Sequence, residues 1–167
     1  MLVLGVDPGT AITGYGLVRH APDGNQLQAV AYGAINTPSD WAMPERLQKI
    51  YRDLNALIHE HHPTEAAVEQ LFFSRNVKTA LVVGQARGVV LLALADGGLP
   101  VHEYTPLEVK QSVVGYGRAE KAQVQELVKL LLGLDAVPQP DDAADALAVA
   151  ICHVHSARMN SLLAGQT

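Results

Sequence analysis

Cysteine, aromatic residues and charge are all scarce in this chain of 167 residues. The single cysteine, Cys152, cannot form an internal disulfide, which excludes the small secreted scaffolds that depend on such bonds. Charged residues make up 17% of the chain and hydrophobic residues 49%, so the sequence is too apolar for an intrinsically disordered protein. The composition indicates one globular domain with a sizeable core.

Long hydrophobic runs and a basic N-terminus are also lacking. The longest uninterrupted apolar run, Val89 to Ala95, is far shorter than the ~20 residues that span a bilayer. The chain meets Asp7 too early, and without preceding basic residues, for a secretory signal peptide. These absences predict a cytoplasmic protein that is not associated with membranes.

The hydrophobic pattern changes from strand-like to helical near Pro44. Strands are predicted at residues 2–6, 13–20, 26–35, 65–69 and 101–104. Helices are predicted at residues 44–62, 76–95, 106–113, 119–132 and 142–157. Three strands joined by short turns, followed by alternating strands and helices, predict an α/β domain with a mixed sheet covered on both faces. We expect one domain over residues 1–157 and a flexible C-terminal tail over 158–167.

Four acidic residues stand where solubility does not require them. Asp7 follows the first apolar run, and Glu69 ends the fourth expected strand. Asp142 and Asp145 lie three apart at the start of an alanine-rich helix, a spacing that puts both carboxylates on one face. Acids also stabilise helix N-termini, and we assign Asp141 a capping role. Asp145 lies one turn further in, where capping explains it poorly.

Carboxylates that meet in a partly buried site repel one another unless a cation neutralises them. The four acids are hard oxygen donors without a nearby cysteine and histidine cluster, so magnesium or manganese suits them better than zinc. Two such ions about 3.5–4 Å apart would activate a water for in-line attack on a phosphodiester. The spacing alone does not show that the acids meet, so a metal site and ordinary surface acids both stay open at this point.

A set of short motifs occurs in a fixed order from residue 2 to about residue 157. The first half contains Gly5-Val-Asp-Pro-Gly-Thr10, Thr13-Gly-Tyr-Gly16, Ala67-Val-Glu-Gln70 and Gly84-Gln-Ala-Arg-Gly88. The second half contains Val109-Lys-Gln111, Val114-Gly-Tyr-Gly117, Glu120-Lys-Ala-Gln-Val124 and Asp142-Ala-Ala-Asp-Ala-Leu147. Each motif is weak alone, but in this order the chain closely resembles the RuvC family of bacterial Holliday junction resolvases.

The resemblance implies an RNase H-like fold, a five-stranded mixed sheet with helices on both faces, and a homodimer that cuts four-way DNA junctions. It implies that Asp7, Glu69, Asp142 and Asp145 bind two Mg²⁺ ions, with Mn²⁺ as a substitute, and catalyse hydrolysis, Asp7 bridging the ions. Some members carry histidine at the position of Asp142. The implied products are paired symmetric nicks with 5′-phosphate ends, made in homologous recombination and DNA repair. The implied partner is the RuvA–RuvB branch-migration complex.

A local excess of basic residues accompanies the net charge of −5. Residues 75–121 contain six Lys or Arg and four acids, a balance of +2, while the remainder balances to −7. Since four of those negative charges are the expected metal ligands, a basic DNA-binding face is compatible with an acidic protein. The resemblance implies that Lys110 and Lys121 hold phosphates and that Phe72 stacks on an unpaired base. The expected DNA-binding residues are Phe72, Arg75, Lys78, Lys110, Arg118 and Lys121.

Plainer interpretations stay open for several residues. An exposed helix lysine often binds nothing, and phenylalanine more often packs in a core, which is the role we expect for Phe73. Gly84 and Gly88 favour close helix packing, and the resemblance assigns their helix to the dimer interface. We assign no metal site to His153 and His155, because residues two apart on a helix point in different directions.

Three other functions compete with junction cleavage. An actin-like or sugar-kinase ATPase shares a strand and turn like Asp7-Pro-Gly-Thr10, but those proteins bind nucleotide between two such halves, and this chain has room for one. An RNase H-like nuclease acting on RNA keeps the same fold, and a non-catalytic junction-binding module keeps the DNA. The presence of all four acids favours a nuclease over a binding module.

Overall fold

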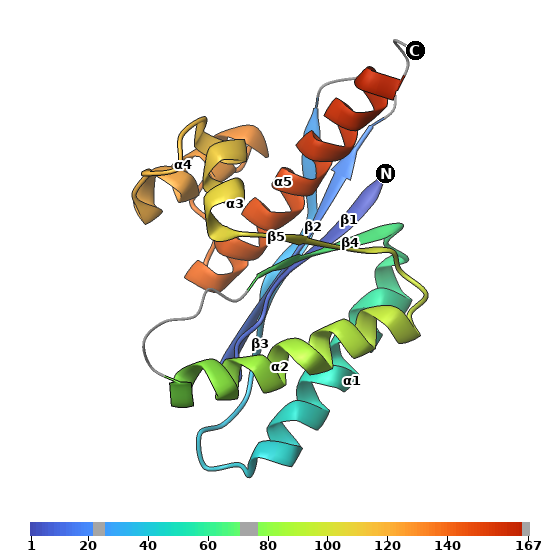
Figure 1. The fold of residues 1–167 in the computed structure, drawn as a ribbon, viewed down its shortest axis with the longest axis vertical. Helices are drawn as coiled ribbons and strands as arrows, with labels where there is room; N and C mark the ends of the chain where they lie inside the picture. Colours follow the sequence, from blue (N-terminus) through green and yellow to red (C-terminus); the bar gives the residue numbers. More distant parts are fainter. Residues whose placement is uncertain (22–25, 71–76, 165–167) are drawn as a thin grey trace.

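The computed structural model describes residues 1–21, 26–70 and 77–164. In this part of the chain a five-stranded sheet separates two groups of helices (Figure 1). The strands are β1 (Leu2–Asp7), β2 (Ile12–His20), β3 (Leu27–Asn36), β4 (Glu65–Glu69) and β5 (Val101–Tyr104). The helices are α1 (Met43–His61), α2 (Val77–Asp96), α3 (Pro106–Val114), α4 (Lys121–Leu131) and α5 (Asp141–Ala164).

The sheet is mixed, with the strand order β3-β2-β1-β4-β5. The first three strands form an antiparallel meander, and β4 and β5 then add parallel to β1. Helices α1 and α2 cover one face, while α3, α4 and α5 cover the other (Figure 1). This arrangement confirms the expected mixed α/β architecture of the RNase H-like type.

The alternation of side chains along β1 decides which face carries Asp7. Leu4 and Val6 pack in the core shared with α1 and α2, whereas Val3 packs in the core shared with α5. Successive residues of a strand point to opposite faces, so Gly5 and Asp7 lie on the same face as Val3. Asp7 is therefore directed toward α5.

Helix α5 lies close to β1 and β2 because glycines leave its path free of side chains. A Cβ on Gly5 would lie 2.1 Å from the carbonyl oxygen of Ala146, and a Cβ on Gly14 would lie 1.9 Å from that of Asp142. Gly14 is also the residue of β2 that pairs with Asp7 of β1. The contact therefore brings the first turn of α5 over the end of β1.

The start expected for α5 is correct to within one residue, but the capping role of Asp141 and the expected C-terminal end are wrong. The helix begins at Asp141, so this residue belongs to the first turn and does not cap the helix. It continues to Ala164, whereas we expected an end near Ala157. Residues 158–164 contain no glycine or proline, and several of them are strong helix formers. The extent of the domain and the flexibility of a C-terminal tail stay predictions.

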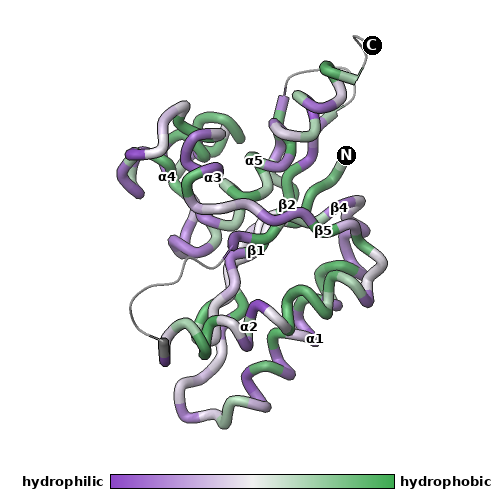
Figure 2. The backbone as a smooth tube through the Cα atoms, in the orientation of Figure 1, coloured by the Kyte–Doolittle hydropathy of each residue, from purple (hydrophilic) through white to green (hydrophobic). Residues whose placement is uncertain are grey.

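Helix α2 carries more apolar surface than the sheet covers, and Figure 2 colours much of it as hydrophobic. The side chains of Leu81 and Leu92 are 67% and 53% exposed. In the described part of the chain, residues 78–96 form the one helix that is long and apolar enough to cross a membrane, and 22% of that segment is buried. No membrane-spanning segment is predicted from the sequence when only uninterrupted apolar runs are counted. In a single chain, α2 exposes an apolar face to solvent.

The close approach at Gly14 predicts the effect of adding one methyl group. The Gly14→Ala variant has to move the first turn of α5 or β2, and overpacking of this kind costs about 1–3 kcal/mol of unfolding free energy. Urea denaturation measures this loss. Arg19→Ala serves as the control because it changes an exposed residue of the same strand and should stay within about 0.5 kcal/mol. Equal stability of Gly14→Ala and the unchanged protein would contradict the packing described for α5.

Candidate active site

Asp7 and Glu69 end two neighbouring parallel strands at the same edge of the sheet. Val6 of β1 pairs with Val68 of β4, and each acid is the next residue of its strand. Ligands commonly bind beyond the carboxyl ends of strands in α/β sheets. The two carboxyl groups share a hydrogen bond. The sheet thus brings together two acids that are far apart in the sequence.

The turn that follows Asp7 is held by a threonine. The fully buried Thr13 donates a hydrogen bond from Oγ1 to the carbonyl oxygen of Gly9 at 2.6 Å. Thr13 Oγ1 also accepts a hydrogen bond from the amide of Gly9 at 3.4 Å. Both bonds join the start of β2 to the turn, which fixes the end of β1 and with it the position of Asp7.

Asp142 and Asp145 reach the same edge from the first turns of α5. Both are half-buried, and the negative charge of each acts on Asp7 strongly enough to raise its pKa. The charge of Asp145 also acts on Glu69. The structure therefore brings all four predicted acids together, and we call this group the carboxylate cup. Their catalytic and metal-binding roles stay predictions.

The carboxylate cup holds more negative charge than its surroundings neutralise. Burial, and then the charges of Asp145 and Asp142, raise the pKa of Asp7 to about 6. Burial and the charges of Asp7 and Asp145 raise the pKa of Glu69 to about 8. Burial also raises the pKa of Asp145, although Lys121 acts against it. At neutral pH, Glu69 therefore carries the proton of the pair, and Asp7 accepts the hydrogen bond.

Two lysines border the cup. Lys121, the first residue of α4, lies with Nζ 2.9 Å from Asp145 Oδ2 and 3.4 Å from Asp141 Oδ2. Burial lowers the pKa of Lys121, but its hydrogen bonds to these two acids and their charges outweigh burial and raise it. Lys110 of α3 and Lys121 line a cavity of about 200 Å³ together with Glu69 and Asp145. Asp141, which sequence reasoning assigned to capping, instead pairs with Lys121.

The other expected DNA-binding residues lie elsewhere or outside the described part of the chain. Lys78 is exposed near the start of α2, and Arg118 is exposed between α3 and α4. Phe72 and Arg75, and also Phe73, fall within residues 71–76, outside the described residues. Their contacts with DNA stay predictions.

Sequence reasoning missed a second polar group at the other end of β4. Glu65, His102 and His153 bring one ligand atom each to within 4.8 Å of one another. The signal was present in the sequence, because Glu65 and Glu69 lie four apart in a strand and so share a face. The sequence did not predict that β5 pairs with β4 and so adds His102 to this face.

The donors of the carboxylate cup fit a hard divalent cation. All four are carboxylates, and among the described residues that line the adjoining cavity there is no cysteine or histidine. Oxygen donors of this kind suit Mg²⁺ or Mn²⁺. Burial, and then the negative charges of the neighbouring acids, raise the pKa values of Asp7 and Glu69, so the carboxylate forms are poorly stabilised there. A bound cation would stabilise them.

Comparison with known proteins gives one consistent result. The family model described as "Crossover junction endodeoxyribonuclease RuvC" matches residues 3–153. The protein of that name from Heliobacterium modesticaldum is 62% identical over 156 residues, which cover 93% of this chain and 95% of that protein. The structure of Thermus thermophilus RuvC superposes with a TM-score of 0.88 at 37% identity, covering 96% of this chain and 97% of that one. The T. thermophilus protein in complex with a Holliday junction substrate gives 0.90 at 36% identity, with 96% of each chain covered.

The raised pKa of Glu69 predicts how stability depends on pH without divalent cations. The folded protein keeps a proton on Glu69 up to about pH 8, whereas the unfolded chain loses it near the ordinary value of 4.5. The free energy of unfolding contributed by this group therefore falls as pH rises through that window. Glu69→Gln removes the cost of ionising this side chain in the folded protein. At pH above 8 in the presence of a chelator, the free energy of unfolding of the variant should therefore exceed that of the unchanged protein by at least about 1.4 kcal/mol, the equivalent of one pKa unit.

Denaturation curves of the two proteins at several pH values give the difference directly. Glu60→Gln, at an exposed position of α1, is the matched control and should follow the unchanged protein at every pH. If the stability of Glu69→Gln and of the unchanged protein varied with pH in parallel, the pKa of Glu69 would not be raised in the folded protein.

Proposed function

The chain belongs to the RuvC family of crossover junction endodeoxyribonucleases, and on this basis we propose that it resolves four-way DNA junctions by metal-dependent hydrolysis of phosphodiester bonds. The observation that carries the proposal is the carboxylate cup, four acids from β1, β4 and α5 with two lysines at its border. The complex of the T. thermophilus relative with a Holliday junction substrate supports the choice of DNA substrate. Each resolution consists of two symmetric nicks that leave 5′-phosphate ends.

The proposed cofactor is Mg²⁺, two ions in each site, with Mn²⁺ as a substitute. Such ions lower the pKa of a bound water, stabilise the leaving oxygen and neutralise charge on the scissile phosphate. Asp7, Glu69, Asp142 and Asp145 would hold them. Glu69 has to give up its proton to serve as a ligand, so binding is favoured at higher pH.

The two lysines act on the phosphate and on the cup. Lys121 already neutralises part of the charge of Asp145, at an Nζ to Oδ2 distance of 2.9 Å. Lys110 lines the same cavity, and its charge acts on Glu69. Held on separate helices, the two cations can contact a phosphate from different sides and offset charge that develops during hydrolysis. We assign Lys78, Arg75 and Arg118 to contacts with the backbone of the junction arms and Phe72 to base stacking.

The alternative functions are not favoured. The family match over residues 3–153 is to a DNA endonuclease, and the described residues form one five-stranded sheet with its helices, whereas the ATPase alternative needs a nucleotide cleft between two such units. An RNA substrate has no observation in its support. A non-catalytic junction module would not need crowded acids that destabilise the protein at neutral pH.

Cleavage of defined substrates tests the proposal. The purified protein is incubated with a four-way junction, a linear duplex and an RNA–DNA hybrid, each with Mg²⁺ and with a chelator. We expect symmetric nicks in the junction only, and only with Mg²⁺. Asp7→Asn should lower cleavage by at least about 100-fold, the loss that follows removal of one electrostatic stabiliser, while junction binding is kept.

Lys129→Gln is a control at a position on α4 away from the cup and should cut at the unchanged rate. Cutting of the hybrid in preference to the junction would favour the RNA-directed alternative. Equal cutting by Asp7→Asn would remove the carboxylate cup from the mechanism.

We further propose that the protein acts as a homodimer whose interface includes α2. Leu81, Gly88 and Leu92 are exposed and recur at a spacing of seven and then four residues, which places them along one stripe of the helix. A Cβ on Gly88 would meet nothing within 4 Å, so a second helix can approach there. Twofold symmetry would place two active sites on opposed strands of a junction.

We also propose the RuvA–RuvB branch-migration complex as a partner, because the chain belongs to the RuvC family.

A charge introduced into the stripe should separate the subunits. Leu92→Glu would bury an unpaired carboxylate in the interface, which should weaken the dimer at least about tenfold. Sedimentation equilibrium measures the change. Leu130→Glu is the matched control, since Leu130 is 66% exposed but lies on α4, and this variant should stay dimeric. A dimer of unchanged affinity in Leu92→Glu would place the interface elsewhere.

A further inference from the structure

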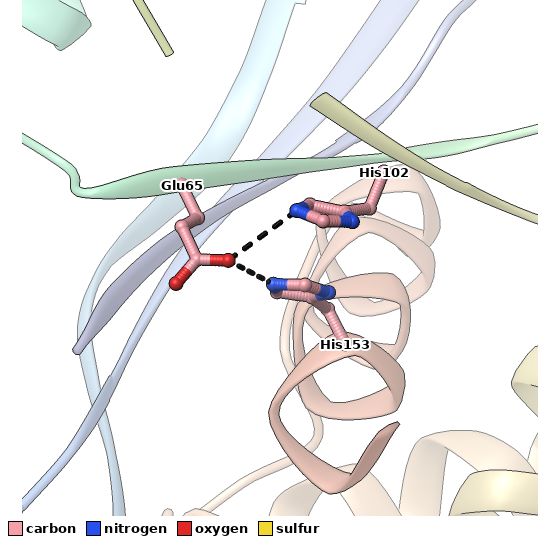
Figure 3. A group of neighbouring side chains, drawn as sticks. All are labelled: Glu65, His102 and His153. Carbon is pink, nitrogen blue, oxygen red and sulfur yellow. Dashed lines mark hydrogen bonds and ion pairs between the residues drawn. The ribbon is translucent and has the colours of Figure 1, made fainter. Parts of the chain in front are cut away.

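A second constellation of ligand-type side chains lies at the opposite end of β4 from the carboxylate cup. Glu65 begins β4, His102 lies in β5, and His153 lies in α5 (Figure 3). Glu65 is separated from Glu69 by about 13 Å along the strand. His153 is separated from Asp145 by about 12 Å along the helix. The two sites therefore sit at the two ends of one contact between α5 and the parallel strands.

Strand alternation explains why these side chains meet. Glu65 and Glu69 lie on the α5 face of β4, with the small residue Ala67 between them packed in the core that α5 shares. Ala67 pairs with His102 of β5, which puts His102 on the same face. His153 is 3% exposed and projects from α5 toward Glu65. Three polar side chains thus meet between the sheet and α5.

The three ligand atoms lie within 4.8 Å of one another, with the carboxylate oxygen of Glu65 between the two imidazole nitrogens. Glu65 Oε2 lies 2.8 Å from His153 Nε2 and 3.3 Å from His102 Nε2. Zinc–nitrogen and zinc–oxygen bonds of about 2.0–2.2 Å in tetrahedral geometry require ligand atoms about 3.4 Å apart. The distance from Glu65 to His102 fits this value, and the distance from Glu65 to His153 has to widen by about 0.6 Å on the same geometry. The two imidazole rings stack with centroids 4.2 Å apart, so both Nε2 atoms face the same carboxylate oxygen (Figure 3).

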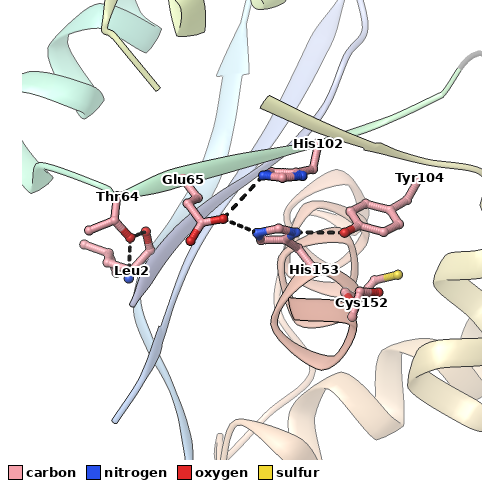
Figure 4. Close-up of polar contacts among 8 residues, drawn as sticks. Leu2, Thr64, Glu65, His102, Tyr104, Cys152 and His153 are labelled. Atoms are coloured by element: carbon pink, nitrogen blue, oxygen red, sulfur yellow. Dashed lines mark hydrogen bonds and ion pairs between the residues drawn. The ribbon is translucent and has the colours of Figure 1, made fainter. Parts of the chain in front are cut away.

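Tyr104 supplies the outer hydrogen bond that metal-binding histidines use. Its hydroxyl lies 2.7 Å from Nδ1 of His153, on the side of the ring away from Glu65 (Figure 4). A tyrosine hydroxyl can donate or accept, so it can pair with either tautomer of the ring. When Nε2 binds a metal, Nδ1 carries the proton and donates it to the tyrosine oxygen. Partners of this kind orient the ring and strengthen its bond to the metal.

We propose that Glu65, His102 and His153 bind one divalent transition-metal ion, best matched by Zn²⁺. Two imidazoles and one carboxylate favour zinc over magnesium, which prefers oxygen ligands. The side chain of His102 is 43% exposed, which gives an ion an entry path and leaves a position for water. The bound ion would join α5 to β4 and β5 and so hold the two elements that carry Asp145 and Glu69. This proposal does not depend on nuclease activity.

Metal binding in the full-length protein tests the proposal. Zn²⁺ is titrated against a chromophoric chelator in excess Mg²⁺, which occupies the carboxylate cup. We expect about one Zn²⁺ per chain with a rise in melting temperature, and Co²⁺ should give visible d–d bands without a sulfur charge-transfer band. His102→Gln should lose both the bound zinc and the rise in melting temperature. Tyr104→Phe should weaken binding about 10- to 100-fold.

His155→Gln is the matched control because His155 lies two residues further along α5 and contacts Ser112 instead of Glu65. It should bind zinc as the unchanged protein does. His102 is partly exposed, so its substitution should leave the circular dichroism spectrum unchanged even if a change at the buried His153 unfolds the chain. Zinc binding that survives His102→Gln, zinc binding that is lost in Asp7→Asn instead, or no zinc binding at micromolar metal would each overturn the proposal.

Discussion

The constraint on the rest of the structure is that folding holds four half-buried carboxylates together at one edge of the sheet. Burial and neighbouring charge raise the pKa of Asp7 to about 6 and of Glu69 to about 8, so folding places these acids where they are least stable as anions. A protein tolerates such a cost where the strained groups have a use. The packing of the rest of the fold supplies the free energy that keeps the acids together.

The packing of α5 on the sheet contributes to that free energy and sets the position of two of the acids. Its alanine-rich surface lies on glycines of β1 and β2, so close that a single Cβ on Gly14 would meet the backbone of Asp142. The same helix spans the sheet from the carboxylate cup to the Glu65, His102 and His153 group. The geometry of both polar sites therefore depends on the position of α5 relative to β4. Displacing α5 by a fraction of an ångström would alter both.

Much of the fold and the cup could be predicted from the sequence, and the remainder depended on contacts between distant segments. Asp7 at the end of an apolar run and Asp142 and Asp145 on one helix face are local patterns, and the ordered motifs identified the family. The pairing of Asp141 with Lys121 was missed because it joins two helices whose relative positions only the folded chain defines. His102 was missed for the same reason, since its partner strand is far away in the sequence.

The proton held by Glu69 gives the most direct measurement of whether the carboxylate cup is an ion-binding site. Titration calorimetry of Mg²⁺ into the protein at pH 7, repeated in buffers of different ionisation enthalpy, counts the protons released as the ions bind. Binding that requires Glu69 to ionise should release close to one proton per chain, and less in Glu69→Gln. Mg²⁺ binding without proton release, or with the same release in Glu69→Gln, would contradict a shared cation site formed by the four acids.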